Sequence, residues 1–94
     1  MPPIPYTKSA GLQQIGENIR KWRLLKGYKQ AAFAAELEIS DVALSKIETG
    51  KTDIPLGRLF QIAFVLELRV ELLFSDPQYL LQSQTELPLG RVIK

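Results

Sequence analysis

The chain has 94 residues and a formal net charge of +2, and 46% of its residues are hydrophobic, which fits one small globular domain. It contains no Cys and no His, which excludes disulfides, thiolate nucleophiles, Cys/His zinc sites and imidazole acid–base chemistry. We therefore expect no enzyme, no cofactor and no metal site, and the lack of a long apolar run or signal peptide predicts a cytoplasmic protein that does not bind a membrane.

The N-terminal part predicts an arm followed by a helix. Residues 1–10 contain three prolines and no periodicity, which indicates a flexible arm. From Leu12, apolar residues recur at helical spacing as far as Trp22, and Gly27 is a suitable residue to end a helix. We predict a helix over about residues 11–26, with Trp22 as its core anchor.

The next segment has the layout of two short helices that cross at a tight turn. We predict one helix over residues 30–37 and a second from Asp41 to about Thr49, with Ser40 as its N-cap. Glu38 falls in the turn, where a left-handed backbone would favour Gly and costs another residue on the order of 1 kcal/mol. Ala34 is small enough to let the helices approach, above four apolar residues: Leu37, Ile39, Leu44 and Ile47.

The C-terminal third predicts a helix and a strand. Apolar residues from Leu56 to Leu66 repeat at helical intervals after Pro55, and the period then changes to two between residues 68 and 74. Because a lone strand leaves its backbone unpaired, we expect it to pair across a homodimer, with Arg69 opposite Glu71 of a second copy. The alternative is a continuation of the preceding helix. The dimerisation residues are then Leu68, Arg69, Val70, Glu71, Leu72 and Phe74.

The overall expectation is an all-α domain of four to five helices over residues 11–76, with one C-terminal strand, and a flexible tail over residues 77–94. Five cations are crowded into ten residues and could form a footprint for phosphates or simply a solvated helix face. These cations are Arg20, Lys21, Arg23, Lys26 and Lys29.

Six segments, in this order, resemble the helix-turn-helix family of phage repressors and their bacterial relatives, of the Cro or XRE type: IGENIRKWR, GYKQ, FA, IS, LSKIETGK and LGRLFQIA. The resemblance implies that the third helix enters the major groove of DNA and that flanking helix ends hold phosphates. It also implies a structural pair between Arg23 and Glu48. The DNA-binding residues would be Gln30, Ser40, Asp41, Val42, Ser45, Lys46, Thr49 and Lys51.

This chain departs from the family at the start of the third helix, where Gln, Ser or Thr is common. Asp41 could accept a hydrogen bond from a cytosine amino group, or it could only stabilise the helix dipole. Val42 and Ala43 offer apolar contact alone, for instance to a thymine methyl group. Lys46 is then the best candidate for a contact with guanine.

The fourth helix, the segment LELRVELLF and the polar tail together resemble HipB-type antitoxins of HipA-kinase modules. This resemblance implies a bacterial, nucleoid-associated repressor that acts on palindromic double-stranded DNA in its own operon. It also implies binding to a HipA-like serine/threonine kinase, as the antitoxin of a type II toxin–antitoxin module. The alternatives are a stand-alone phage- or host-type repressor, and an interaction adaptor that has lost DNA binding.

Overall fold

The computed structural model describes residues 7–80, and over this range the chain is helical and contains no strand. The predictions of an arm and a tail fall largely on residues 1–6 and 81–94, outside the described range. A helical turn at residues 77–80 comes after the last element. The elements are α1 (Lys8–Leu25), α2 (Gln30–Leu37), α3 (Asp41–Glu48), α4 (Leu56–Leu66) and a 3₁₀ helix, η1 (Val70–Phe74).

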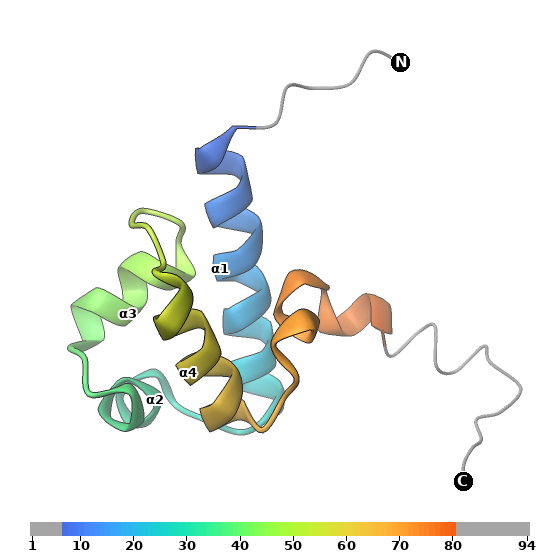
Figure 1. Cartoon of the computed structure of the whole chain (residues 1–94). Helices are drawn as coiled ribbons and strands as arrows, with labels where there is room; N and C mark the ends of the chain where they lie inside the picture. Colours follow the sequence, from blue (N-terminus) through green and yellow to red (C-terminus); the bar gives the residue numbers. More distant parts are fainter. Residues whose placement is uncertain (1–6, 81–94) are drawn as a thin grey trace, which may run out of the picture.

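The long helix α1 runs through the middle of the molecule (Figure 1). The pair α2 and α3 lies on one side of it, and the segment after α4 lies on the other. Their apolar faces meet in one core, because each helix buries the stripe that repeats every three or four residues. The buried hydrophobic residues are Ile19, Phe33, Ala34, Leu37, Leu44, Ile47, Leu59, Ile62, Ala63, Leu66 and Leu73.

Local capping chemistry explains where the helices begin and end. The Ser40 hydroxyl accepts a hydrogen bond from the Ala43 amide at 3.0 Å, which confirms the predicted N-cap of α3. Thr7 caps α1 in the same way, so the predicted start at about residue 11 is too late. Glu38 ends α2 with a left-handed backbone at φ 60°, as the turn geometry predicted, and Glu67 ends α4 similarly at φ 59°.

Two glycines let α1 and α3 pack with their backbones in contact. A Cβ atom added to Gly16 would lie 2.3 Å from the Ile47 carbonyl oxygen, so only glycine fits there. Gly50 has φ +75°, and a Cβ atom there would lie 2.7 Å from the backbone of Gln13. The C-terminal end of α3 and the turn after it are therefore held at a fixed distance from α1.

The prediction of a strand at residues 68–74 is wrong, because this segment forms η1 and packs on α1 and α4. Leu73, which the alternating pattern did not place on its core face, is completely buried. Arg69 pairs with Glu71 of its own chain at 3.1 Å instead of facing a second copy. In this structure, therefore, no pairing strand is formed by the residues predicted for dimerisation, which are Leu68, Arg69, Val70, Glu71, Leu72 and Phe74.

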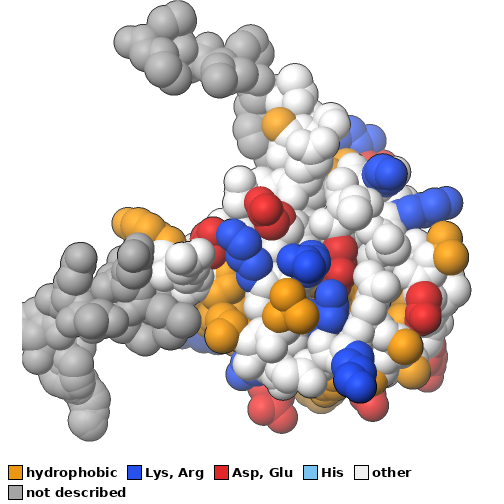
Figure 2. All heavy atoms as spheres, turned by 180° about the vertical axis from the view of Figure 1, so that it is seen from behind, with side chains coloured by type: hydrophobic (Ala, Val, Ile, Leu, Met, Phe, Trp, Pro, Cys, Tyr) orange, Lys and Arg blue, Asp and Glu red, His pale blue; other side chains and the backbone are white. Residues whose placement is uncertain are grey.

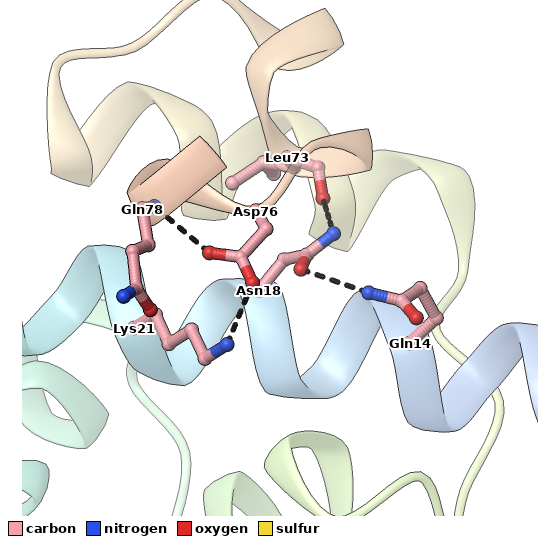
Figure 3. Close-up of polar contacts among 6 residues, drawn as sticks. All are labelled: Gln14, Asn18, Lys21, Leu73, Asp76 and Gln78. Carbon is pink, nitrogen blue, oxygen red and sulfur yellow. Dashed lines mark hydrogen bonds and ion pairs between the residues drawn. The ribbon is translucent and has the colours of Figure 1, made fainter. Parts of the chain in front are cut away.

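Side chains of α1 supply the polar partners that hold this C-terminal segment. The Asn18 amide donates a hydrogen bond to the Leu73 carbonyl at 3.0 Å, and the Trp22 indole donates one to the Leu72 carbonyl at 3.0 Å. Lys21 forms an ion pair with Asp76 at 2.7 Å (Figure 3). Because these donors lie about fifty residues earlier in the chain, the local alternation at residues 68–74 does not reveal them.

The ion pair between Lys21 and Asp76 also shifts the pKa values of both groups. The hydrogen bond from Lys21 lowers the pKa of Asp76 from its ordinary 3.8, and the same bond raises the pKa of Lys21 from 10.5. Pro77, the residue after Asp76, is buried. The packed domain therefore continues past the predicted boundary at residue 76.

Candidate nucleic-acid interface

Helix α3 has one buried side and one outward side. Leu44, Ile47 and Glu48 face the protein interior. Val42, Lys46 and Thr49 form an outward ridge at spacings of four and three residues, and these three residues together are called the α3 ridge. Val42 is 65% exposed. A short helix held in this way presents a few side chains rigidly to an external partner.

The remaining predicted contact residues surround the ridge but differ in how free their side chains are. Asp41 is exposed in the first turn, and the Ser40 hydroxyl is used as the helix cap. The Thr49 hydroxyl donates a hydrogen bond to the Ser45 carbonyl at 2.7 Å, so it is partly occupied. Lys51 lies directly after the ridge, where its amide donates a hydrogen bond to the Lys46 carbonyl at 2.9 Å.

Two cations of this surface are available to a ligand. Lys46 and Lys51 are both at the surface, and within residues 7–80 neither forms an ion pair. By contrast, Lys8 forms an exposed ion pair with Asp53 at 2.9 Å. Lys46 and Lys51 are therefore the free positive charges at and beyond the ridge.

Arg23 and Glu48, the pair expected from the sequence, form an ion pair in the interior. The Arg23 Nε lies 2.7 Å from the Glu48 Oε2, and both side chains are almost completely buried. A second Arg23 nitrogen donates a hydrogen bond to the Tyr28 carbonyl at 2.8 Å. The pair thus ties α1 to the end of α3 and to the loop before α2.

Gln30 belongs to the same network, which the sequence did not reveal. Its side-chain Nε2 donates a hydrogen bond to the Glu48 Oε1 at 3.3 Å. This contact places the N-terminus of α2 beside the C-terminus of α3. Lys29, at the N-cap position of α2, makes no side-chain capping hydrogen bond.

The five crowded cations do not make one footprint. Arg23 is buried with Glu48, and Lys21 is paired with Asp76, so only Arg20, Lys26 and Lys29 remain exposed without an ion pair in the described part of the chain. Successive helical residues point in different directions, and Figure 2 shows basic and acidic side chains interspersed on the face behind that of Figure 1. The structure favours the solvated-face interpretation of this cluster.

Residues 7–80 contain no group of three or more Asp, Glu, His or Cys side chains arranged to hold a metal ion. None of the helices described is both long enough and apolar enough to cross a membrane.

Two helices joined by a short turn, with the second presenting its outer side, define a helix-turn-helix unit. The family profile described as helix-turn-helix matches residues 19–73, which is more than half of the chain. The protein therefore belongs to the helix-turn-helix family. Among curated proteins, no match is found.

Solved structures share this fold. The restriction-modification controller protein C.AhdI from Aeromonas hydrophila superposes with a TM-score of 0.69 and 23% identity, over 73% of this chain and 100% of that one. The hypothetical transcription factor NHTF from Neisseria gives a TM-score of 0.71 and 22% identity, over 92% and 97% of the two chains. Both likenesses concern the arrangement of the helices.

Proposed function

We propose that this protein is a sequence-specific DNA-binding transcriptional repressor that inserts α3 into the major groove. The observation that carries the proposal is the two-sided character of α3, whose inner side is locked into the core while the α3 ridge stays at the surface. Family membership supports the same function, because helix-turn-helix units place their second helix in the major groove.

The exposed groups suggest a division of roles. Lys46 lies on the ridge and contacts a base edge, preferably guanine, whose O6 and N7 accept hydrogen bonds. Lys51, at the exit of α3, contacts the phosphate backbone. The first-turn amides of α2 lack a side-chain cap and lie at the positive end of the helix dipole, so they add a second phosphate contact near Gln30. Asp41, Ser45 and Thr49 are the remaining side chains of the proposed DNA-binding surface.

A homodimer is part of this proposal, with α4 as its interface in place of the strand. Leu56, Phe60 and Phe64 recur every four residues along α4 and are 67%, 53% and 81% exposed. Gly57 lies beside this stripe, and no atom within 4 Å would meet a Cβ atom there. An apolar stripe with room for close approach supports packing against a second α4, and two copies would suit a palindromic site.

DNA binding is tested by selecting duplexes from a random library with the purified protein and measuring affinity by fluorescence anisotropy. We expect an enriched, approximately palindromic sequence and an affinity that falls steeply as salt rises, because phosphate contacts release counterions. Enrichment of no sequence would overturn the proposal and favour the adaptor alternative.

The dimer is tested by analytical ultracentrifugation of Phe60→Glu and Phe64→Glu, with Leu25→Glu as the control. Leu25 is also 54% exposed, but it lies at the end of α1. We expect the two α4 variants to sediment as monomers and the control to sediment as the wild type does. A wild-type protein that is monomeric at micromolar concentration would refute the α4 interface.

A narrower candidate is the antitoxin of a toxin–antitoxin module with a HipA-like kinase. The segment that resembles such antitoxins forms η1 instead of a strand, which removes the main support. What still favours a protein partner is a second apolar surface at the end of α1, where the exposed side chains of Leu24 and Leu25 line a shallow hollow together with Lys21 and Gln78. Co-purification with the products of neighbouring genes tests this role, and recovery of a kinase bound in a stable complex is the expected result.

A further inference from the structure

Val42 is an aliphatic side chain at an exposed point of a helix that otherwise buries its large apolar residues. It is 65% exposed in the first turn of α3, whereas Leu44 and Ile47 of the same helix are buried. Nothing in the packing of residues 7–80 requires valine at this position, because the side chain points away from the core. An exposed valine on the α3 ridge therefore calls for an explanation outside the monomer.

The surroundings of Val42 extend its apolar surface. A groove of about 430 Å³ runs beside α3, and its apolar lining is Ile39, Val42, Ala43, Ile47 and Pro55. Its polar lining is Ser40, Lys46, Thr52, Asp53 and Arg58. The Arg58 guanidinium donates a hydrogen bond to the Leu37 carbonyl at 3.0 Å, so it is directed inward to the turn. Val42 thus lies among other apolar side chains on one part of a groove whose remaining lining is polar, and Lys46 supplies a free positive charge one turn later.

The chemistry of the major groove limits what a valine can recognise there. Valine has no hydrogen-bond donor or acceptor in its side chain, so it cannot distinguish bases by their polar edges. Among the four bases only thymine presents an apolar group in the major groove, its C5-methyl. Burial of that methyl group against Val42 is the one favourable base contact open to this side chain.

We infer that Val42 recognises the C5-methyl group of a thymine, and that this thymine lies within about two base pairs of the guanine contacted by Lys46. The spacing is expected because four helical residues rise about 6 Å, which is less than two steps of roughly 3.4 Å along the duplex. This inference rests on the proposed function and specifies what the α3 ridge reads.

The test replaces thymine by uracil, which removes only the methyl group. In a duplex selected by the wild-type protein, each thymine of one half-site is replaced in turn by uracil, and affinity is measured by fluorescence anisotropy. We expect one position at which affinity falls about four-fold, the value for burial of one methyl group. At that position, duplexes with cytosine and 5-methylcytosine should differ in the same direction, the methylated one binding more tightly.

Protein variants assign the effect to Val42. Val42→Ala should bind the thymine and uracil duplexes with nearly equal affinity, because its side chain no longer reaches the methyl group. Lys46→Ala serves as the matched control on the same ridge, and it should keep the roughly four-fold preference for thymine while losing the preference for guanine.

The outcomes separate this inference from the proposed function. A selected duplex that binds equally well with every thymine replaced would overturn the inference and leave DNA binding intact. A Val42→Ala variant that keeps the full preference for thymine would also overturn it. Failure to select any duplex would overturn the proposed function and the inference together.

Discussion

The side-chain amide of Asn18 donates a hydrogen bond to the main-chain carbonyl of Leu73, 3.0 Å away, and so joins α1 to η1 across 55 residues of chain. Asn18 is fully buried, and its own carbonyl oxygen accepts a hydrogen bond from Gln14 at 3.2 Å (Figure 3). Both ends of this amide are therefore satisfied. The contact explains how a short 3₁₀ helix stays in one place on the domain.

Replacing Asn18 by Leu should destabilise the domain by about 1–3 kcal/mol, because the buried Leu73 carbonyl would lose its donor. The free energy of unfolding is measured by urea denaturation followed by circular dichroism. Gln14→Ala is the control, since Gln14 is exposed and its loss should cost far less. An equally small loss of unfolding free energy in the two variants would show that the Leu73 carbonyl finds another hydrogen-bond donor.

Gly16→Ala should destabilise the domain by at least about 1–3 kcal/mol, because the new Cβ atom would overlap the backbone of α3. The closest atom, the Ile47 carbonyl oxygen, would be 2.3 Å away. The matched control is Gly57→Ala, where nothing lies within 4 Å and the higher helix propensity of alanine should give a small gain. Thermal unfolding at low protein concentration compares the two, and an unchanged midpoint for Gly16→Ala would contradict the close approach.

Arg23→Met should cost about 3–5 kcal/mol, because it leaves the Glu48 carboxylate buried without its cation. The double variant Arg23→Met with Glu48→Leu should be less destabilised than the sum of the two single changes. Arg69→Met provides the control, since its pair with Glu71 is exposed and screened by solvent, so its loss should change the free energy of unfolding far less. Additive losses in the double variant would argue against direct coupling.

The pair of Lys21 and Asp76 predicts a pH-dependent contribution to stability. Because the pKa of Asp76 is lowered in the fold, its contribution is present above 3.8 and is lost as the pH falls through the lowered value. Because the pKa of Lys21 is raised, its contribution is present below 10.5 and is lost as the pH rises through the raised value. The wild type should exceed Asp76→Asn in stability between these limits, and the difference should shrink at more acidic pH. A difference that stays constant down to about pH 2 would refute the assignment.

Lys46→Ala and Lys51→Ala should differ in how they change DNA binding. Loss of a base contact at Lys46 should relax the sequence preference by about 1–3 kcal/mol at one position. Loss of a phosphate contact at Lys51 should weaken binding to all DNA sequences about equally. It should also reduce the slope of log affinity against log salt concentration by about one. Parallel competition assays against the selected duplex and a scrambled one distinguish the two roles, and identical behaviour would contradict them.

The helices could be predicted from the sequence because their signals are local. Ser40 caps the helix that begins after it, Gly27 and Glu38 take up left-handed backbones at helix ends, and apolar residues repeat at helical intervals. The predicted bounds of α2 agree with the structure. Helix α4 begins directly after Pro55 and ends at Leu66, as the apolar repeat predicted. Each signal lies within a few residues of the feature it determines.

The C-terminal segment could not be predicted in this way because its partners are distant. Leu72, Leu73 and Phe74 are consecutive apolar residues, so the same sequence fits an alternating strand or a tight helix with Leu73 inward. The choice depends on Asn18 and Trp22, whose donors meet the carbonyls of this segment only after folding. Leu56 likewise matches the helical repeat of core residues but lies on the exposed stripe of α4.

For the candidate site, residue spacing indicated outward positions of α3, and the family resemblance implied the pairing of Arg23 with Glu48, which the structure contains. The sequence did not indicate that Gln30 is held by Glu48, which depends on the crossing angle of two helices. Nor did the sequence indicate that Lys21, one of the five crowded cations, is paired with Asp76.

Val42 and Lys46 carry none of the packing that holds α3, whose position is fixed by Gly16, Gly50 and the buried Arg23–Glu48 pair. Mutations on the ridge can therefore accumulate at little expense in folding free energy. A lineage that inherits this scaffold is free to change what the ridge recognises by exchanging a few outward side chains, while its architecture stays unchanged.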